Sequence, residues 1–241
     1  MRPMEPAANT GTLRDPRLIE GVLSNLAIFA GASPGRIAAL VRHCWVVPAR
    51  RGDIVARQGD CVPGVFAIAY GQVKLTLRPP GHEERVVRIA SAGEVFGEAA
   101  TLLGQASRYE ALALADSKLV VIPAAPLLGL IDSEPRFARN LLRLLAESNL
   151  ELLREIESAA LGGTQRLVSY LVSLAPPVNG SGACTVRLPV TKTLLAARLG
   201  VKKETLSRLL RTLAERGLIE VTHRDITLLD PARLADGAGA D

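Results

Sequence analysis

The 241-residue sequence predicts an α+β protein that combines an antiparallel β-roll, a long helix and a carboxyl-terminal winged helix-turn-helix. Three observations carry this prediction. Short β-type runs fill the chain from Cys44 to about Val121, apolar residues follow a heptad spacing over 142–159, and two short amphipathic helices meet at Gly200. We place the parts at 1–15 (a flexible tail), 16–133 (the β-roll), 134–161 (the long helix) and 162–241 (the winged helix-turn-helix).

Two helices are expected ahead of the roll, at 17–29 and 33–43, and Ser33-Pro34 supplies a cap and a first-turn proline for the second. Seven short runs rich in β-branched and apolar residues follow, with Gly and Pro between them: CWVV, DIVAR, VFAIAY, QVKLTL, RVVRIA, YEALALA and KLVVI. Strands this short and this closely spaced favour a compact antiparallel sandwich or barrel-like roll.

One segment interrupts these runs, because EAATLL at 98–103 is typical of a short helix and Gly97 precedes it. Such a helix start exposes backbone N–H groups and a positive dipole end, which suits an anion. Arg108, ten residues after Glu98, could add a bidentate charge to the same anion. The alternative is that Glu98 and Arg108 form a purely structural ion pair.

The helix expected at 134–161 carries an apolar seam with one polar member: Leu142, Leu145, Asn149, Leu152, Ile156 and Ala159. This spacing is that of the a and d positions of a coiled coil, where a single Asn can fix register and oligomer state. We therefore predict a parallel homodimer. The alternative is that this face packs on the chain's own roll.

The last part of the chain predicts two helices with a tight turn between them. Thr191 or Thr193 can cap the first helix, Gly200 ends it, and the second begins near Lys202. Eight Lys and Arg against two Glu give positions 185–216 a net charge of +6. A surface of this charge suits a phosphate backbone, and the alternative is an ordinary solvated helical hairpin.

A β-hairpin is expected after these two helices, from GLIEV and DITLL on either side of His223-Arg224. The hairpin makes the module winged, and Arg224 at its tip could contact phosphate. We expect the final ARLADGAGAD to be frayed.

Composition is that of an ordinary globular protein, with 48% hydrophobic and 22% charged residues. No apolar run approaches the roughly 18 residues that span a bilayer, and the first residues lack the apolar segment of a signal peptide. We therefore expect a cytoplasmic protein without a membrane partner. The three Cys and three His are dispersed, so we predict no metal site and no disulfide framework.

In this order the pieces resemble the Crp/Fnr family of bacterial transcription regulators over nearly everything from Leu26 to Leu234. The matching segments are RRGDIVARQGD, YGQVKL, VFGEAA with Arg108, the long helix, TQRLVSYL and GVKKETLSRLLRTLAERGLIEV, of which the last is the most specific. The resemblance implies a cyclic-nucleotide-binding-type roll that senses an effector and a dimerisation helix. It also implies a winged helix that binds double-stranded DNA near promoters, with RNA polymerase as a further partner.

By position, Glu204 and Arg208 match the family's base-reading pair, and together they can read one G·C pair of a half-site. Ser207 completes the Glu-x-x-Ser-Arg pattern of the Fnr-like branch, which implies a palindrome related to TTGAT-N4-ATCAA. Lys203 departs from the common branch patterns, so the outer bases stay open. The residues predicted to contact DNA are Thr191, Lys192, Lys202, Lys203, Glu204, Thr205, Ser207, Arg208, Arg211 and Arg224.

The effector site implied by the resemblance comprises Gly97, Glu98, Ala99, Arg108 and Tyr109. Glu98 suits a ribose hydroxyl and Arg108 suits a phosphate. The family's cyclic AMP pocket has Ser or Thr after the arginine, however, where this chain has Tyr109 followed by a carboxylate that would repel a phosphate. In addition, Glu151 and Leu152 stand where adenine-contacting hydroxyl residues are expected. These departures argue against cyclic AMP.

Other effector groups follow from branches of the family. The amino-terminal cysteine cluster of the oxygen-sensing branch is missing, which argues against an iron–sulfur cluster. Some relatives with a Glu-x-x-Ser-Arg helix resemble haem-based nitric oxide sensors, so a gas bound to haem is an alternative to a small-molecule effector. His43 or His82 could then be an axial ligand, and nothing in their spacing singles out either.

Two further classes of function are weighed against a DNA-binding regulator. A cyclic-nucleotide-binding regulatory subunit acting through protein contacts would share the roll, but the basic second helix argues against it. An enzyme using Glu98, Arg108 and a histidine would need a nucleophile–base pairing or metal-ligand spacing that the sequence lacks. We therefore predict no catalytic residues.

Overall fold

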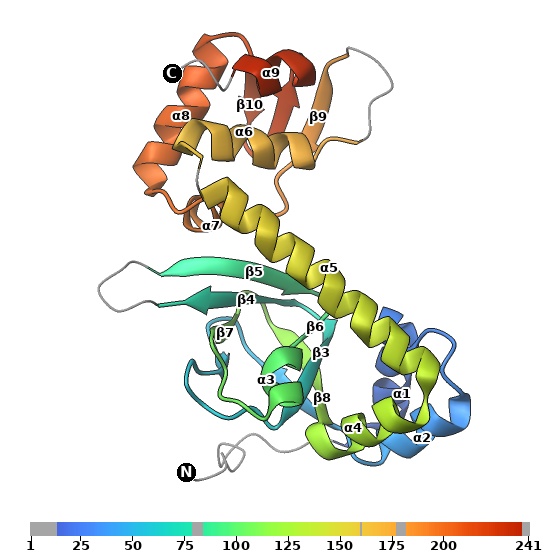
Figure 1. Ribbon diagram of the computed structural model, residues 1–241. Helices are drawn as coiled ribbons and strands as arrows, with labels where there is room; N and C mark the ends of the chain where they lie inside the picture. The colour runs from blue at the N-terminus through green and yellow to red at the C-terminus, as the bar shows by residue number, and fades with distance from the viewer. Residues whose placement is uncertain (1–13, 79–83, 160, 177–181, 238–241) are drawn as a thin grey trace. The chain divides into compact units, whose positions relative to one another are not determined.

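The computed structural model describes residues 14–78, 84–159, 161–176 and 182–237 (Figure 1). The chain divides into two compact units, residues 1–148 and 149–241, and the boundary falls inside the long helix α5 (Pro135–Ala159). Of the tail expected at 1–15, positions 1–13 lie outside the described residues. Among the described helices, none has the length and apolar character needed to cross a membrane.

Two four-stranded antiparallel sheets form the roll of unit 1 (Figure 1). The first has the order β1–β8–β3–β6, with strands Trp45–Ala49, Ser117–Pro123, Gly64–Tyr70 and Val95–Phe96. The second has the order β2–β7–β4–β5, with strands Ile54–Ala56, Glu110–Ala113, Gln72–Leu77 and Arg85–Ser91. All seven predicted runs are strands. The sequence does not indicate the two-residue β6, because glycines flank it and the segment is typical of a turn and a helix start.

The inner faces of the two sheets enclose one apolar core, as the period of two along each strand requires. Its buried members include Phe66, Ile68, Val73, Leu75, Ala90, Phe96, Ala111, Leu119 and Val121. The rings of Phe66 and Phe96 stack with centroids 4.9 Å apart and planes 5° apart. Tyr109 also packs against this core, which places its phenol inside the roll.

A second core lies between the first sheet and the helices that cover it, namely α1 (Pro16–Asn25), the 3-10 turn η1 (Ala27–Phe29), α2 (Pro34–Val41), α4 (Ala124–Ser133) and the first turns of α5. The two helices predicted ahead of the roll are confirmed, although the first ends at Asn25. Helix α4 was not predicted because Pro126 suggests a break. Pro126 is in fact the third residue of α4, where a missing N–H breaks no intrahelical bond.

Unit 2 is a winged helix-turn-helix, as predicted. Its elements are α6 (Gly163–Ser173), β9 (Cys184–Arg187), α7 (Lys192–Arg198), α8 (Lys203–Glu215), β10 (Ile219–Thr222), β11 (Asp225–Leu228) and α9 (Pro231–Gly237), and its sheet has the order β10–β11–β9. The expectation of a frayed end is wrong for 232–237, which belong to α9. Asp230 Oδ1 accepts the Arg233 N–H at 3.0 Å, and Leu234 is fully buried.

Candidate DNA-binding surface and effector site

The turn between α7 and α8 is built from local signals that the sequence displays. Thr191, rather than Thr193, caps α7, because its hydroxyl oxygen accepts the Leu194 N–H at 3.3 Å. After α7, Gly200 adopts a φ of +63°, a left-handed conformation that costs glycine little. Apolar side chains of both helices are buried in the core of unit 2: Leu195, Leu199, Leu206, Leu210 and Leu213.

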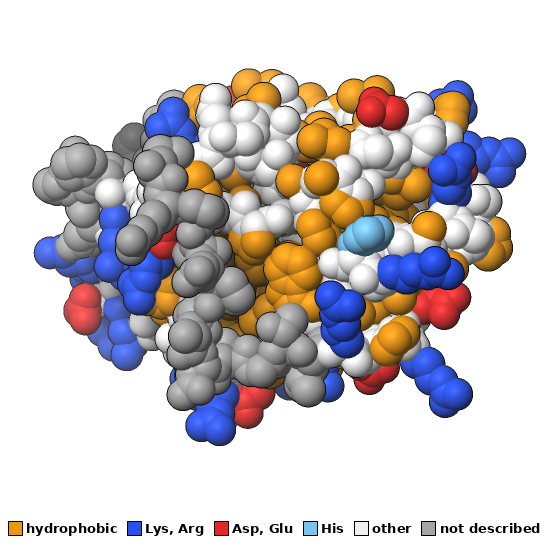
Figure 2. Space-filling view, turned by 90° about the horizontal axis from the view of Figure 1, so that it is seen from below, with side chains coloured by type: hydrophobic (Ala, Val, Ile, Leu, Met, Phe, Trp, Pro, Cys, Tyr) orange, Lys and Arg blue, Asp and Glu red, His pale blue; other side chains and the backbone are white. Residues whose placement is uncertain are grey.

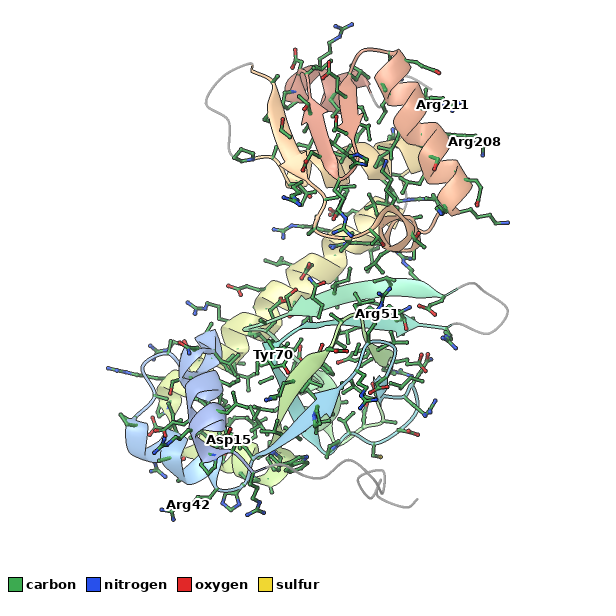
Figure 3. All side chains as sticks on the ribbon, turned by 180° about the vertical axis from the view of Figure 1, so that it is seen from behind. Asp15, Arg42, Arg51, Tyr70, Arg208 and Arg211 are labelled. Carbon is green, nitrogen blue, oxygen red and sulfur yellow. The ribbon has the colours of Figure 1, made fainter. Side chains whose placement is uncertain are left out.

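The opposite face of α8 is polar and exposed. Lys203, Glu204, Ser207, Arg208 and Arg211 all lie on it, and the labelled Arg208 and Arg211 extend away from the wing sheet in Figure 3. Within the described part of the chain, neither Glu204 nor Arg208 forms an ion pair of 4.0 Å or less. The Ser207 hydroxyl donates to the Lys203 carbonyl at 3.0 Å, so it is already committed within the helix. The charges of Glu204 and Arg208 are therefore free for a partner, as are those of Lys203 and Arg211 on the same face.

The other predicted DNA contacts are distributed around α8 in the same unit. Thr191 and Lys202 are exposed at the starts of α7 and α8, whereas Lys192 and Thr205 are half-buried. Arg224 is exposed in the two-residue turn of the wing hairpin, next to His223 with its positive φ of 54°. The structure thus brings nine predicted residues onto α7 and α8 and their caps, and leaves Arg224 on the separate wing.

Helix α5 exposes an unusual amount of apolar surface. Leu142 and Ile156 are each 67% exposed, and Leu152 is 50% exposed. The predicted seam is incomplete, because Leu150 and Leu153 are also exposed, at 54% and 49%, and do not belong to it. Asn149 is exposed as well. Leu145, in contrast, packs against the core of unit 1, so at this residue the alternative holds, and the face packs on the chain's own roll. The side chain of Ala159 lies outside the described residues.

In the roll, the predicted effector residues surround helix α3 (Glu98–Leu103). Gly97 precedes it with a φ of +88°, and a Cβ there would lie 3.3 Å from the Gly64 carbonyl oxygen and 3.4 Å from the Phe66 ring. The Gly97 N–H donates to the Tyr109 hydroxyl at 2.7 Å. One backbone N–H group at this helix start, that of the N-cap Gly97, is therefore occupied by the chain's own phenol.

Glu98 is 8% exposed, and its partner is Arg88 of β5, not Arg108: Arg88 Nη1 lies 3.8 Å from Glu98 Oε1. Arg88 also donates through Nη2 to the Val95 carbonyl. Burial raises the pKa of Glu98, and the nearby Arg88 charge only partly opposes this. Arg108 is exposed, and Ala99 is exposed on α3. The alternative of a Glu98–Arg108 ion pair is therefore wrong.

Arg88 was missed although the sequence contains a signal for it. In a strand, alternate residues share a face, and Arg88 has the same parity as the buried Val86 and Ala90. A charged side chain at such a position must find a partner inside the roll.

Tyr109, which precedes β7, and Glu110, the first residue of β7, point in different directions, which removes the predicted repulsion. The Glu110 carboxylate pairs with Arg78 at 3.3 Å, whereas Tyr109 packs inward. Burial, with a contribution from the Glu98 charge, raises the pKa of Tyr109 to about 12, so the phenol stays neutral at physiological pH. Glu110 is thus turned away from the effector residues.

The histidines and cysteines do not converge within the described residues, where no group of three or more His, Cys, Asp or Glu could hold a metal. His43 is exposed on the turn after α2, beside a surface groove that Arg36 and Pro126 also line. Figure 2 looks onto this end of unit 1, where hydrophobic side chains lie among Lys and Arg. His82 lies outside the described residues. The thiol of Cys44 is buried and donates to the Leu40 carbonyl at 3.3 Å, and burial raises its pKa to about 12.

Comparison with known proteins matches both units. Residues 46–134 match the cyclic nucleotide-binding domain and residues 165–236 match the Crp-like helix-turn-helix domain. The CRP-like cAMP-activated global transcriptional regulator of Mycobacterium tuberculosis is 27% identical over 223 residues, which cover 90% of this chain and 98% of that protein. Transcriptional activator protein FnrA of Stutzerimonas stutzeri is 26% identical over 202 residues, which cover 80% of each chain.

Solved structures agree with these matches. A transcriptional regulator of the CRP/FNR family from Thermus thermophilus is 27% identical with a TM-score of 0.59, over 81% of this chain and 98% of that one. A CooA mutant from Carboxydothermus hydrogenoformans, 20% identical, shares the fold with a TM-score of 0.69 over 82% of this chain and 88% of its own. The protein is therefore a DNA-binding transcription regulator with an effector-binding domain. It belongs to the Crp/Fnr family.

Proposed function

We propose that the protein is a homodimeric regulator, without enzymatic activity, that binds a palindromic TTGA-type DNA site and responds to a small effector held in its roll. The observation that carries the DNA half of this proposal is the exposed face of α8. Glu204 and Arg208 are one helical turn apart, exposed and without ion-pair partners among the described residues. An arginine suits guanine O6 and N7 and a glutamate suits cytosine N4, so the pair is suited to one G·C pair.

The proposed site is related to TTGAT-N4-ATCAA. Selection of bound sequences from random DNA by the purified full-length protein tests it directly. We expect an inverted repeat whose half-sites share a G·C pair at one fixed position. Binding without sequence preference would contradict the proposal and favour the alternative of a regulatory subunit that acts through protein contacts. RNA polymerase, the partner proposed at promoters, would be tested on the selected site by transcription in vitro.

Dimerisation is proposed through α5, because its exposed leucines and Ile156 would otherwise leave apolar surface in water. A matched pair of substitutions tests this. Leu142 on α5 and Leu103 on α3 are both leucines with 67% exposure, so Glu at either position leaves its charge in water in the monomer. We expect Leu142→Glu to shift the mass measured by light scattering from dimer toward monomer and Leu103→Glu to leave it unchanged. Equal behaviour of the two variants would contradict an interface on α5.

The effector is proposed to be a small molecule bound inside the roll, and two features argue against cyclic AMP. Tyr109 occupies the Gly97 amide, and the positive Arg88 lies 3.8 Å from Glu98, the residue that the family pattern assigns to the ribose. Haem fits the described residues poorly, because the imidazole of His43 is exposed on a turn rather than enclosed. An absorption spectrum of protein purified without oxygen, before and after addition of haem, tests the gas-sensing alternative: a Soret band that shifts with nitric oxide or carbon monoxide would establish it.

A further inference from the structure

Arg88 and Glu98 form a polar pair inside the roll, and two of their buried atoms lack hydrogen-bond partners in the described part of the chain. Arg88 Nε and Glu98 Oε2 are both buried and have no hydrogen-bond partner among the described residues. The contact between the two side chains, at 3.8 Å between Nη1 and Oε1, uses the other atoms and is loose for an ion pair. Buried polar atoms in native proteins nearly always have partners, so this pair of orphaned atoms calls for a group that joins them.

The groups that face Glu98 determine what that group can be. Arg88 of β5 and the Tyr109 phenol, which precedes β7, are the ionisable side chains that act on Glu98 from neighbouring elements. Arg88 Nε–H is a donor, and the phenol, which accepts the Gly97 N–H, still has its own O–H to donate. A carboxyl group that takes up a proton becomes a third donor. Three donors around one fixed positive charge suit an oxyanion.

The room available favours a ligand of few atoms. The Phe66 ring lies against Gly97 and stacks on Phe96, and Tyr109 packs against the same core. Aromatic side chains packed this closely beside Gly97 disfavour a large ligand at the neighbouring Glu98.

We propose that the roll binds a small monovalent oxyanion at Arg88 and that Glu98 takes up one proton as the anion binds. In the ligand-free protein the positive Arg88 balances the negative Glu98. In the complex it balances the anion, and the neutral carboxylic acid of Glu98 donates a hydrogen bond to that anion. The buried charge is zero in both states, which avoids the large cost of an uncompensated buried ion. The inference deepens the proposed function, because it rests on the roll being the effector domain.

Calorimetric titration of the full-length protein tests the proposal. The probes are nitrate, acetate and propionate, with cyclic AMP as a comparison, in Bis-Tris and imidazole buffers that contain no oxyanion. The heat measured in two buffers of different ionisation enthalpy gives the number of protons taken up, and we expect one. Nitrate does not titrate in this range, so its pH dependence reports the protein alone. Its affinity should fall about tenfold for each pH unit above the pKa of Glu98.

Four variants separate the roles of the side chains. Glu98→Gln keeps a donor in place but cannot titrate, so we expect anion binding that takes up no proton and does not vary with pH. Arg88→Gln should abolish binding of every probe. Arg108→Gln tests whether the arginine that the family pattern assigns to the phosphate holds the anion instead. Arg85→Gln is the control, because Arg85 is exposed on the same strand as Arg88, and it should bind the probes as the wild type does. Thermal unfolding of each variant establishes whether the roll is folded. If Arg88→Gln does not fold, the proposal is tested by the number of protons that Glu98→Gln takes up on binding an anion, which should be zero.

The outcomes of the anion-binding experiment can be told apart from those of the DNA-binding experiment. Binding of nitrate alone assigns an inorganic anion, and binding of acetate or propionate alone assigns a carboxylate; both support the proposal. The proposal is overturned if no probe binds, if the wild type takes up no proton, or if Arg108→Gln rather than Arg88→Gln abolishes binding. Gel-shift measurements on the same samples show whether sequence-specific DNA binding, and with it the proposed function, stands independently.

Discussion

The two candidate sites use the same two residue types in opposite ways. On α8, Glu204 and Arg208 belong to one helix, are exposed and have no ion-pair partner among the described residues. In the roll, Glu98 and Arg88 come from different elements, are largely shielded from water and pair with each other. Exposure leaves charge available for a large external partner, whereas burial forces the charges to balance internally.

This difference has an energetic basis. Even where exposed Glu and Arg side chains pair, the pair contributes only about 0–1 kcal/mol, so the unpaired α8 residues break no valuable contact when they bind DNA bases. A buried pair that loses one member leaves an uncompensated charge, which costs about 3–5 kcal/mol. The surface of α8 can therefore bind its partner without rearrangement, while any ligand of the roll must preserve the charge balance.

The largest expected effect is on the free energy of unfolding, and it concerns one glycine in each region: Gly71 in the roll and Gly200 between α7 and α8. A Cβ at Gly71, which has a φ of +95°, would lie 2.1 Å from Ser117 Oγ and 2.7 Å from Ser117 Cα, whereas one at Gly200 would meet nothing within 4 Å. Gly71→Ala should therefore lower the free energy of unfolding by about 3 kcal/mol or more, from steric overlap and backbone strain together. Gly200→Ala should cost about 1–2 kcal/mol, from strain alone.

Urea unfolding measures the two glycine variants separately. Trp45, the single tryptophan of the chain, lies in β1 and reports on the roll, whereas circular dichroism follows the helices of both units. Unfolding of unit 2 alone therefore changes the circular dichroism but not the fluorescence of Trp45. Equal losses for Gly71→Ala and Gly200→Ala would mean that the close approach to Ser117 is relieved at no cost.

The second prediction concerns the exposed pair. Arg208→Ala should weaken binding to the selected site by about 1–3 kcal/mol and remove the preference for G·C at one position of each half-site. Lys192→Ala is the matched control, since loss of a phosphate contact should weaken all sequences alike and reduce the salt dependence. Competition gel shifts with single-base variants of the site measure both effects. An unchanged sequence preference in Arg208→Ala would show that α8 reads DNA through another face.

The same contrast explains what could be predicted from the sequence. The helix-turn-helix depends on signals within about ten residues of one another, such as the Thr191 cap, Gly200 and the leucine spacing, and it was predicted nearly residue by residue. The roll interior depends on pairs far apart in the chain. Strand alternation indicates that Arg88 faces inward, but its partner Glu98, and the contact between Tyr109 and Gly97, depend on the pairing of distant strands, which no local pattern specifies. The strands were therefore predicted, but the partner of Glu98 was not.

A third prediction follows from the raised pKa of Glu98. A carboxyl whose pKa is higher in the folded than in the unfolded state holds more protons when folded, so stability is lost as pH rises from the unfolded toward the folded pKa. Glu98→Gln removes this titration. The free energy of unfolding of the variant relative to the wild type should therefore increase with pH across this window and level off above it.

Parallel urea titrations between pH 4 and 8 measure this relative stability, and Glu110→Gln is the control. Glu110 lies on the outward face and pairs with Arg78. A relative stability of Glu98→Gln that does not change with pH would show that Glu98 titrates in the folded roll as it does in the unfolded chain.

The smallest effect concerns Thr191, which is both the cap of α7 and a predicted DNA contact. Thr191→Ala removes the bond to the Leu194 N–H and should lower the free energy of unfolding of unit 2 by about 1 kcal/mol, whereas Thr193→Ala, which removes no cap bond, should change it little. If Thr191 acts only as a cap, both variants bind DNA equally under conditions in which both are fully folded. A weaker affinity of Thr191→Ala for all sequences would add a phosphate contact at the start of α7, because loss of the cap alone leaves the exposed face of α8 unchanged.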